Sequence, residues 1–530
     1  MYLPYDSIVQ CAWADGPAGR SRYDNYLLDL WDYIPGDDDD CKDPRTHEGN
    51  CQFKLKRSTQ DAVNAIMGDN FCGMENGEQD GRYQTAFNGE LLCSTGGGVM
   101  SAAAEQRKAF LHFTRFADRM ADDLGNKLIS VDSLFNVHYF AHAGFHTMLG
   151  FETGEALPNP QVAYAFHRGA AKQYGQLIWG MVSIFDRHGF KKCWQPAGYD
   201  PKNASSPCVC TEEGTSLSLM RRLMYTLLAY GGRAFSFEML AGCQAPHGPT
   251  GTGGVSCCGD PHPGPPKSPI AQMQVSGVKF AQQQSMAQST HVAQYAIFLD
   301  YFSGFQPPRS LYDFTTSYER WGKFDWNAND FATHGVLNML YPGYDKSSFY
   351  VDETGFQTPT PFGDAADVLL SDATLQLLSR YPVVVATTSI ISAKAEVSDK
   401  LSRYVASGGV LVVTASTLAS LPDGLLGLSV SERLRGGVAA CKHTVPPGPV
   451  QLNLPSAGGE VTTVDEGAAS AVCRLLVDTS SSYHELPRLK VVAKAHDGTP
   501  LVYSLAAGNG TIFAGESVQF FTGETQSKPL

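Results

Sequence analysis

Three acidic groups each follow a short apolar stretch of the chain. They contain Glu78, Glu152 and Glu238, and the first group reads Glu75-Asn76-Gly77-Glu78. Two carboxyl groups that flank a sugar linkage, one protonated and one ionised, can cleave a glycosidic bond. A separation of about 5–5.5 Å gives retention of the anomeric configuration, and about 6.5–9.5 Å gives inversion. Glu78, Glu152 and Glu238 are therefore the candidate catalytic residues.

The same carboxylates also have a structural interpretation. A carboxylate at the end of a strand can cap the next helix or pair with an arginine, and this reading stays open for each glutamate taken alone. Three such groups on consecutive strand–helix units raise the expectation that at least two of them are catalytic.

Other side chains near these groups can bind a sugar. Trp179 and Phe237 are aromatic residues that can stack on sugar faces. Arg168 can reach a substrate, although an ion pair on a helix surface is the alternative. Trp321 and Trp326 are expected to be packing residues.

Three histidines recur every four residues, at His138, His142 and His146. On one helix they would share a face and could bind a metal ion. No acidic residue stands at the spacing of a zinc protease motif, and no cysteine pairs have the spacing of a zinc ribbon. We therefore expect neither a metal nor another cofactor.

The acidic groups follow a repeated strand–helix pattern. The apolar stretches at 127–132, 147–152, 177–185 and 234–239 read as strands, and so does the stretch that begins at 70. Apolar residues at helical spacing predict helices over 105–124, 160–174 and 215–228. Asn159-Pro160 provides the N-cap and first residue of the second of these helices.

Alternating strands and helices predict a parallel sheet, and carboxylates at the strand ends favour closure into a (β/α)8-type barrel over 66–289. About five strand–helix units are present between 66 and 240, where a barrel needs eight. Either the irregular segment 1–65 holds further strands or the chain begins partway through a barrel. Residues 241–269 form a Gly/Pro/Cys-rich insertion.

A second α/β region is predicted over 290–418. Strands are expected at 295–299, 382–387 and 410–414, with helices at 329–340, 364–380 and 393–406. This order is typical of a doubly wound, flavodoxin-like domain. Its strand ends at 386–389 and 413–416 hold no cysteine and no nucleophile elbow, which favours a non-catalytic role. Residues 419–530 are predicted to form a β-rich region, with one hairpin at 501–505 and 511–514.

The charge and composition of the chain disfavour some classes of binding partner. The 530 residues carry 40 Lys+Arg and 53 Asp+Glu, so the net charge of 40 − 53 = −13 disfavours binding to nucleic acid or to an anionic membrane. No apolar run is long enough to span a membrane, and the first residues do not read as a signal peptide. The 13 cysteines nevertheless lean towards an oxidising, secretory compartment, and a thiol protein is a third reading.

Residues 290–415 resemble a known family. The segments His291–Asp300, Thr360–Val368, Tyr381–Ala386 and Gly408–Val413 resemble the trimerisation domain of the family 42 β-galactosidases. This resemblance implies a barrel, an amidotransferase-like domain that lacks the catalytic cysteine, and a small β region. It also implies that the chain can form a homo-oligomer through the second domain.

The resemblance also implies roles for the carboxylates. The family's acid/base glutamate follows an asparagine, and its nucleophile is a glutamate at the end of the seventh strand. Asn76-Gly77-Glu78 departs from that pair by one inserted glycine, and Glu238 falls on the last predicted strand. We assign Glu78 as acid/base, Glu238 as nucleophile, Glu152 to the cleft, and Asn76 to substrate binding.

These inferences predict a retaining glycoside hydrolase that acts on a β-linked sugar, either a galactoside or a polysaccharide. The alternative is a non-catalytic carbohydrate-binding or scaffold protein derived from such an enzyme. Two carboxyl groups about 5–10 Å apart in an open cleft would favour the enzyme, and scattered or salt-bridged carboxyl groups would favour the binding protein.

Overall fold

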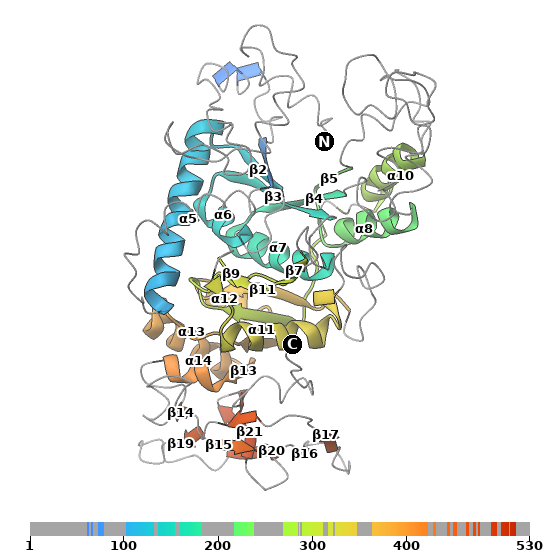
Figure 1. Ribbon diagram of the computed structural model, residues 1–530. Helices are drawn as coiled ribbons and strands as arrows, with labels where there is room; N and C mark the ends of the chain where they lie inside the picture. The colour runs from blue at the N-terminus through green and yellow to red at the C-terminus, as the bar shows by residue number, and fades with distance from the viewer. Residues whose placement is uncertain are drawn as a thin grey trace. The chain divides into compact units, whose positions relative to one another are not determined.

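The computed structural model describes several separate stretches of the chain (Figure 1). They are 61–62, 65–66, 73–78, 102–131, 136–153, 159–182, 217–237, 269–284, 286, 289–310, 316–321, 324–346, 363–421, 428–430, 443–445, 449–452, 463–465, 470–472, 475–477, 489–494, 500–507 and 509–515. Most of the irregular segment 1–65, including the four aspartates at 37–40, and nearly all of the predicted Gly/Pro/Cys-rich insertion lie outside these residues.

The chain divides into two compact units. The first comprises described residues within 1–291, 306–324 and 343–358, and the second those within 292–305, 325–342 and 359–530. Each unit contains its own parallel sheet, so the protein is a mixed α/β fold. No helix in the described part of the chain is long and apolar enough to cross a membrane.

The sheet of the first unit has five strands whose spatial order follows the chain. All neighbouring strands pair in parallel. The strands are β1 (Met74–Glu78), β2 (Leu128–Val131), β3 (His146–Thr153), β4 (Leu177–Val182) and β5 (Ala234–Phe237). Parallel strands in chain order, joined by helices, are the building pattern of a (β/α) barrel.

Helices connect these strands at nearly every step. They are α5 (Ala102–Leu124), α6 (Val137–Ala143), α7 (Pro160–Tyr174) and α8 (Leu217–Ala229), and α10 (Pro269–Gln283) follows the last strand. The predictions for α5, α7 and α8 are confirmed. Helix α10 was not predicted, because it follows directly on the Gly/Pro-rich segment.

Helix α7 shows how local sequence sets an element. The side chain of Asn159 accepts hydrogen bonds from the backbone N–H groups of Gln161, at 2.8 Å, and Val162, at 3.4 Å. Pro160 occupies the first turn, where its missing N–H has no cost. Gly175, at φ 72°, ends the helix in the left-handed conformation that glycine adopts without strain.

The two faces of this sheet contact different groups of residues. Phe151, Ile178 and Phe235 come from three neighbouring strands and pack with Tyr164 of α7 and Leu227 of α8 in one core cluster. This is the helix-covered face. A separate cluster on the other side contains Ile129, Met148, Trp179 and Met181. Strand residues alternate between the two faces of a sheet. The two clusters therefore establish which face each residue of β2 to β5 is on.

A nine-stranded sheet forms the core of the second unit, in the order β11-β6-β12-β13-β22-β21-β20-β16-β17. Its parallel part consists of β11 (Ala366–Leu370), β6 (Tyr295–Leu299), β12 (Val383–Ala386), β13 (Val410–Thr414) and β22 (Gly510–Gly515). Numbered along the chain, this order is 2-1-3-4-5, which is the flavodoxin-like order.

Antiparallel strands extend that sheet. They are β21 (Pro500–Ala507), β20 (Leu489–Lys494), β16 (Pro449–Leu452) and β17 (Thr463–Asp465). The predicted hairpin is therefore confirmed as β21 and β22, and β22 also pairs in parallel with β13. The tail of the chain thus contributes strands to the sheet that the preceding region begins.

The helices of the second unit are α11 (Ala328–Leu340), α12 (Leu375–Leu378), α13 (Lys394–Ala406) and α14 (Ala415–Ser420). Its short paired strands are β14 (Leu428–Val430) with β19 (Leu475–Val477), and β15 (His443–Val445) with β18 (Ser470–Val472). The first unit also contains a 3₁₀ turn at Tyr344–Lys346 and the paired strands β7 (Arg309–Ser310) and β8 (Thr316–Ser317). Strand β9 (Glu319–Arg320) pairs with β10 (Phe324–Asp325).

One prediction in the second unit is wrong. Residues 364–380 were expected to form a helix, whereas the structure has the strand β11 followed by the short helix α12. All five residues of β11 are buried, and each pairs in parallel with β6. A strand buried on both faces lacks the alternation of apolar and polar residues that distinguishes strand from helix, and the sequence Ala-Asp-Val-Leu-Leu of β11 shows no such alternation.

Candidate active site

Glu152 lies near the carboxyl end of β3, beside Met181 of β4 in the sheet register. Phe151 packs towards the helices, so the alternation of strand residues directs Glu152 to the opposite face. Met148, four residues earlier, belongs to the core cluster on that same face. Only 3% of Glu152 is exposed. A carboxyl group therefore lies buried at the edge of the sheet where barrel enzymes position their catalytic residues.

Glu78 is the last residue of β1, and its register partner Val131 is the last residue of β2. The register between the two strands shifts between Glu75 and Glu78, which marks a bulge. The structure gives the backbone positions of Glu78 and Asn76 within β1. Both belong to the strand that borders β2, and Glu78 lies at its carboxyl end.

Glu238 lies outside the described residues. It directly follows Phe237, the last residue of β5, whose register partner is Val182 of β4. Val182 in turn pairs with Thr153, the neighbour of Glu152. The described end of β5 is therefore level with the end of β3, one strand removed across β4.

Trp179 and Arg168 are both buried. Trp179 is 6% exposed and packs with Ile129, Met148 and Met181, on the face that Glu152 shares. Arg168 of α7 is 1% exposed, and its guanidinium carbon lies 4.2 Å from the centre of the Tyr230 ring. The predicted position of Arg168 on a helix surface is wrong, because the side chain is in the core. Substrate binding by either residue stays a prediction.

His167 is a residue of this region that the sequence analysis did not single out. It is fully buried in α7, with Nδ1 2.8 Å from the carbonyl oxygen of Ala163 and Nε2 2.8 Å from the carbonyl oxygen of Gly150. Burial lowers its pKa to about 4; the two carbonyl groups favour the charged ring, and Arg168 opposes it. The sequence feature that could have identified His167 is its position on the apolar side of α7, one turn after Ala163.

The three evenly spaced histidines do not lie on one helix. His138 and His142 are in α6, which ends at Ala143, and His146 begins β3. Within the described ranges, no group of three or more His, Cys, Asp or Glu side chains is arranged to bind a metal ion. Burial lowers the pKa of His146 to about 3.

The strand ends of the second unit carry a buried carboxylate of a different kind. Asp300 follows β6 directly and is 1% exposed. Its Oδ2 accepts hydrogen bonds from the backbone N–H groups of Ile391 and Ser392, each at 3.0 Å, and from the Ser392 hydroxyl at 2.7 Å. Its Oδ1 accepts a bond from the backbone N–H of Phe302 at 3.1 Å. This carboxylate therefore joins the loop after β12 to the end of β6.

The junction of β13 with α14 has ordinary helix-cap geometry. Thr414 has extended backbone angles, φ −81° and ψ 159°, and its hydroxyl accepts a hydrogen bond from the backbone N–H of Thr417. A nucleophile elbow places its nucleophile in a strained turn. Among the described non-glycine residues, only Trp321 and Ala393 have positive φ, so this junction does not have that shape.

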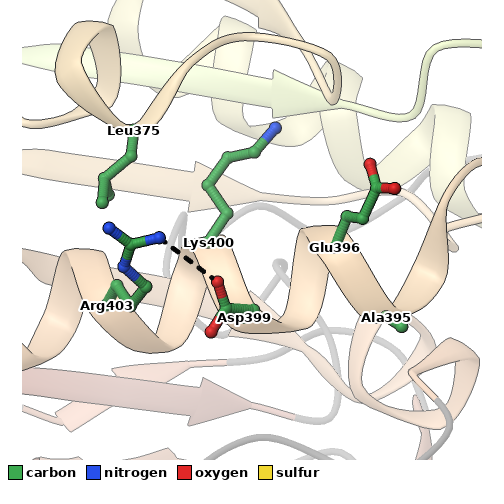
Figure 2. A pocket seen from close by; sticks show the side chains of 6 residues that line it. All are labelled: Leu375, Ala395, Glu396, Asp399, Lys400 and Arg403. Atoms are coloured by element: carbon green, nitrogen blue, oxygen red, sulfur yellow. Dashed lines mark hydrogen bonds and ion pairs between the residues drawn. The ribbon is translucent and has the colours of Figure 1, made fainter.

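A surface groove of about 480 Å³ lies along α13. Figure 2 shows the side chains that line it. Its lining residues are Leu375, Ala395, Glu396, Asp399, Lys400 and Arg403. Arg403 and Asp399 form an ion pair at 3.5 Å, and the Lys400 amino group donates to the carbonyl oxygen of Ser371 at 2.6 Å. The pKa of Lys400 is lowered by burial, and the nearby carboxylates of Asp372 and Glu396 offset only part of this shift. The groove is lined by charges that already interact within the unit.

No family model and no curated protein sequence matches the chain. Several solved structures that resemble it are glycoside hydrolases. The β-galactosidase from Bacillus circulans sp. alkalophilus is 14% identical, with a TM-score of 0.45, over 80% of this chain and 56% of the enzyme. A catalytic mutant of a family 42 β-galactosidase from G. stearothermophilus is 12% identical, with a TM-score of 0.43, over 84% of this chain and 62% of the enzyme.

An exo-β-1,4-mannosidase from the Opitutaceae bacterium strain TAV5 is 10% identical, with a TM-score of 0.42, over 88% of this chain and 72% of that enzyme. The chain thus spans 56% and 62% of the length of the two β-galactosidases. The resemblance to family 42 β-galactosidases, first stated for residues 290–415, recurs among solved structures. At this level of similarity it assigns neither a substrate nor catalytic residues.

Proposed function

We propose that the protein is a glycoside hydrolase that cleaves a β-linked sugar, a galactoside or a polysaccharide, by a retaining mechanism with two carboxyl groups. The observation that carries this proposal is the register of the first sheet. It aligns the ends of β1, β3 and β5 at one edge, where Glu78, Glu152 and the residue before Glu238 lie. Barrel enzymes carry their active sites at this edge.

The alternation of strand residues supports a shared face for the three carboxylates. Glu152 lies on the face opposite to Phe151. Glu238 comes three positions after Phe235, which packs towards the helices, so a continued strand directs it to the same face as Glu152.

The case for Glu78 rests on its register partner. Val131 comes two positions after Ile129, which belongs to the core cluster on the face opposite to the helices. Neighbours in register share a face, so we expect Glu78 on that face as well. The three carboxylates then project into the interior of one barrel, with Trp179 on the same side.

In this proposal each carboxyl group has a role. Glu78, protonated, donates its proton to the glycosidic oxygen as the leaving group departs, and ionised Glu238 attacks the anomeric carbon to form a glycosyl-enzyme. Glu78 then removes a proton from the water that hydrolyses this intermediate. Glu152 lies in the cleft beside them, and a neighbouring carboxylate or burial keeps the acid protonated. Trp179, on the same face as Glu152, and Asn76 and Phe237 at the strand ends are proposed substrate-binding residues. Arg168 is proposed as a further one, although its guanidinium packs on Tyr230 of the helix-covered cluster.

The proposal includes the architecture. The first unit is taken as part of a (β/α)8-type barrel, and the second as an amidotransferase-like domain through which copies of the chain can associate. The flavodoxin-like strand order of the second unit supports this assignment.

A non-catalytic carbohydrate-binding or scaffold protein is the second candidate. The observation that favours it is that the described sheet of the first unit has five strands, with β1 and β5 at its borders. A sheet that does not close holds its side chains less rigidly than a closed barrel.

Hydrolysis of 4-nitrophenyl β-glycosides tests the proposal, with β-galactoside as the first substrate and the released anomer identified by proton NMR. Glu238→Gln should abolish turnover. Glu78→Gln should lose far less rate on this good leaving group than on an alkyl glycoside, because nitrophenolate departs without a proton. Glu75→Gln, from the same acidic group, is the matched control and should keep its activity.

Two results would contradict the proposal. Full activity of both Glu78→Gln and Glu238→Gln would show that the assignment of residues is wrong. A wild-type chain that binds oligosaccharides but hydrolyses no glycoside of the panel would identify the binding protein.

A further inference from the structure

The main chain next to Glu152 has an unusual contact with the helix behind it. His167 reaches from α7 to the carbonyl oxygen of Gly150, which precedes Glu152 by two residues on β3. The imidazole is fully buried, 5.7 Å from the ring of Phe151 and 6.2 Å from the ring of Tyr164. A ring enclosed by two aromatic neighbours has little freedom to turn, so its direction towards Gly150 is set by packing.

Both nitrogens of His167 face carbonyl oxygens. A neutral imidazole has one N–H and one lone pair, so it donates to only one of the two carbonyl groups. The contact to Ala163 is internal to α7, and that helix has a side-chain cap and a proline at its start without it. The contact to Gly150 connects the helix to β3, 17 residues earlier in the chain.

Other bonds secure the same strand end from the opposite side. The hydroxyl of Thr153 donates to the carbonyl oxygen of Met181 at 3.1 Å, which ties β3 to β4 directly after Glu152. The carbonyl group of Gly150, two residues before Glu152, and the side-chain hydroxyl of Thr153, directly after it, are therefore attached to different elements, one to α7 and one to β4.

We infer that His167 is a positioning residue, whose Nε2–H bond to Gly150 holds the end of β3 so that the carboxyl group of Glu152 keeps its place at the sheet edge. This inference rests on the proposed function, because it concerns the geometry of a proposed active-site carboxylate. A displacement of about 1 Å in an active-site group can cost about 100-fold in rate.

Three substitutions separate the two contacts of the ring. His167→Gln places an amide nitrogen near the position of Nε2 and can still donate to Gly150. His167→Asn places its amide nitrogen near Nδ1 and keeps only the contact to Ala163. His167→Met fills a similar volume without a donor. Circular dichroism and thermal unfolding establish first that each variant folds.

The kinetic prediction uses the aryl β-glycoside that the wild-type protein hydrolyses. We expect His167→Gln to keep kcat within about threefold of wild type, and His167→Asn and His167→Met to lower kcat by about 100-fold with KM changed less than about threefold. Equal kcat values for the Gln and Asn variants would overturn the inference. If neither loss variant folds while the Gln variant does, the bond serves the fold and not the position of Glu152, and the inference also fails.

Hydrogen exchange of the β3 peptide, residues 146–153, provides a readout without substrate. Exchange should be about tenfold faster in the Asn and Met variants than in wild type and in the Gln variant. If the wild-type protein hydrolyses no glycoside but exchange follows this pattern, the proposed function has failed and the role of His167 in holding β3 stands. Unchanged exchange in the Asn and Met variants would overturn that role whatever the activity.

Discussion

A buried carboxylate lies at a strand end in each unit, Asp300 in the second and Glu152 in the first, and the bonds described around the two differ. In the second unit, the described bonds go to the carboxyl group of Asp300 itself, from backbone N–H groups and a hydroxyl of its own unit. In the first unit, the described bonds next to Glu152 join the carbonyl oxygen of Gly150 to His167 and the Thr153 hydroxyl to the carbonyl oxygen of Met181. A carboxylate at a strand end is therefore not by itself a sign of catalysis.

The loop that follows β12 explains how the carboxyl group of Asp300 is held. After β12, the chain turns so that successive N–H groups of Ile391 and Ser392 face Asp300, in the kind of concavity that binds an anion. Ala393, at φ 38°, follows them in the left-handed region, which an alanine occupies only under strain. The second unit thus contains its own anion at the crevice where open α/β sheets bind ligands.

Removal of the Asp300 carboxylate should have the largest effect on stability. Asp300→Ala deprives the partly buried N–H groups of Phe302, Ile391 and Ser392 and the Ser392 hydroxyl of their acceptor, and each bond to a charged group contributes up to about 1.5–3 kcal/mol. We expect the free energy of unfolding to fall by about 3–5 kcal/mol, as measured by urea denaturation. Glu152→Gln should cost less than about 1.5 kcal/mol and act instead on turnover. A loss of stability from Glu152→Gln as large as that from Asp300→Ala would remove the contrast between the two carboxylates.

Acid should unfold the first unit before the second. Burial lowers the pKa of His167 to about 4 and that of His146 to about 3, both below the usual 6.5. Between pH 6.5 and these values the unfolded chain binds more protons than the folded one, so stability is complete above pH 6.5 and is lost as the pH falls. For His167 alone the loss by pH 4 is on the order of 3 kcal/mol, at about 1.4 kcal/mol per pH unit.

Tryptophan fluorescence and hydrogen exchange, followed from pH 7 to pH 4, measure this order. His167→Gln removes one of the two groups and should make the acid transition of the first unit shallower. An acid transition that begins in the strands of the second unit would contradict the prediction.

The third prediction concerns the loss of stability when a side chain is added on the helix-covered face of the first sheet. A Cβ atom on Gly180 would lie 2.5 Å from the Tyr164 hydroxyl and 2.7 Å from a methyl carbon of Leu227. Gly180→Ala should therefore cost about 1–3 kcal/mol, since overpacked cores force side chains from their rotamers. Gly409 of the second unit meets the ring of Tyr404 in the same way, so both sheets use a glycine where a helix approaches closely. Recovery of stability in a Gly180→Ala, Leu227→Ala double variant would identify crowding as the cause.

Much of the fold could be predicted from local sequence, and the exceptions involve partners that are distant in the chain. Helix α7 has its cap and proline within two residues of its start, and β6 is a compact apolar run. By contrast β11 becomes a strand because it pairs with β6, about 70 residues earlier. The burial of Glu152 follows from the opposite direction of Phe151, which only the packing of α7 establishes. His167 was missed because its second partner, Gly150, belongs to another element.

The smallest effect is expected on the surface of the second unit. Asp399 and Arg403 form an i,i+4 ion pair at 3.5 Å, and their side chains are 66% and 65% exposed. Solvent screens such a pair, so Asp399→Asn should change the free energy of unfolding by less than about 0.5 kcal/mol, and 1 M salt should abolish even that difference. Urea denaturation at low and high salt measures it, beside Asp300→Ala as the buried counterpart. A cost above about 1.5 kcal/mol for Asp399→Asn would mean that burial is not what separates the carboxylates of this unit, and the contrast between internal bonding and solvent screening would have to be abandoned.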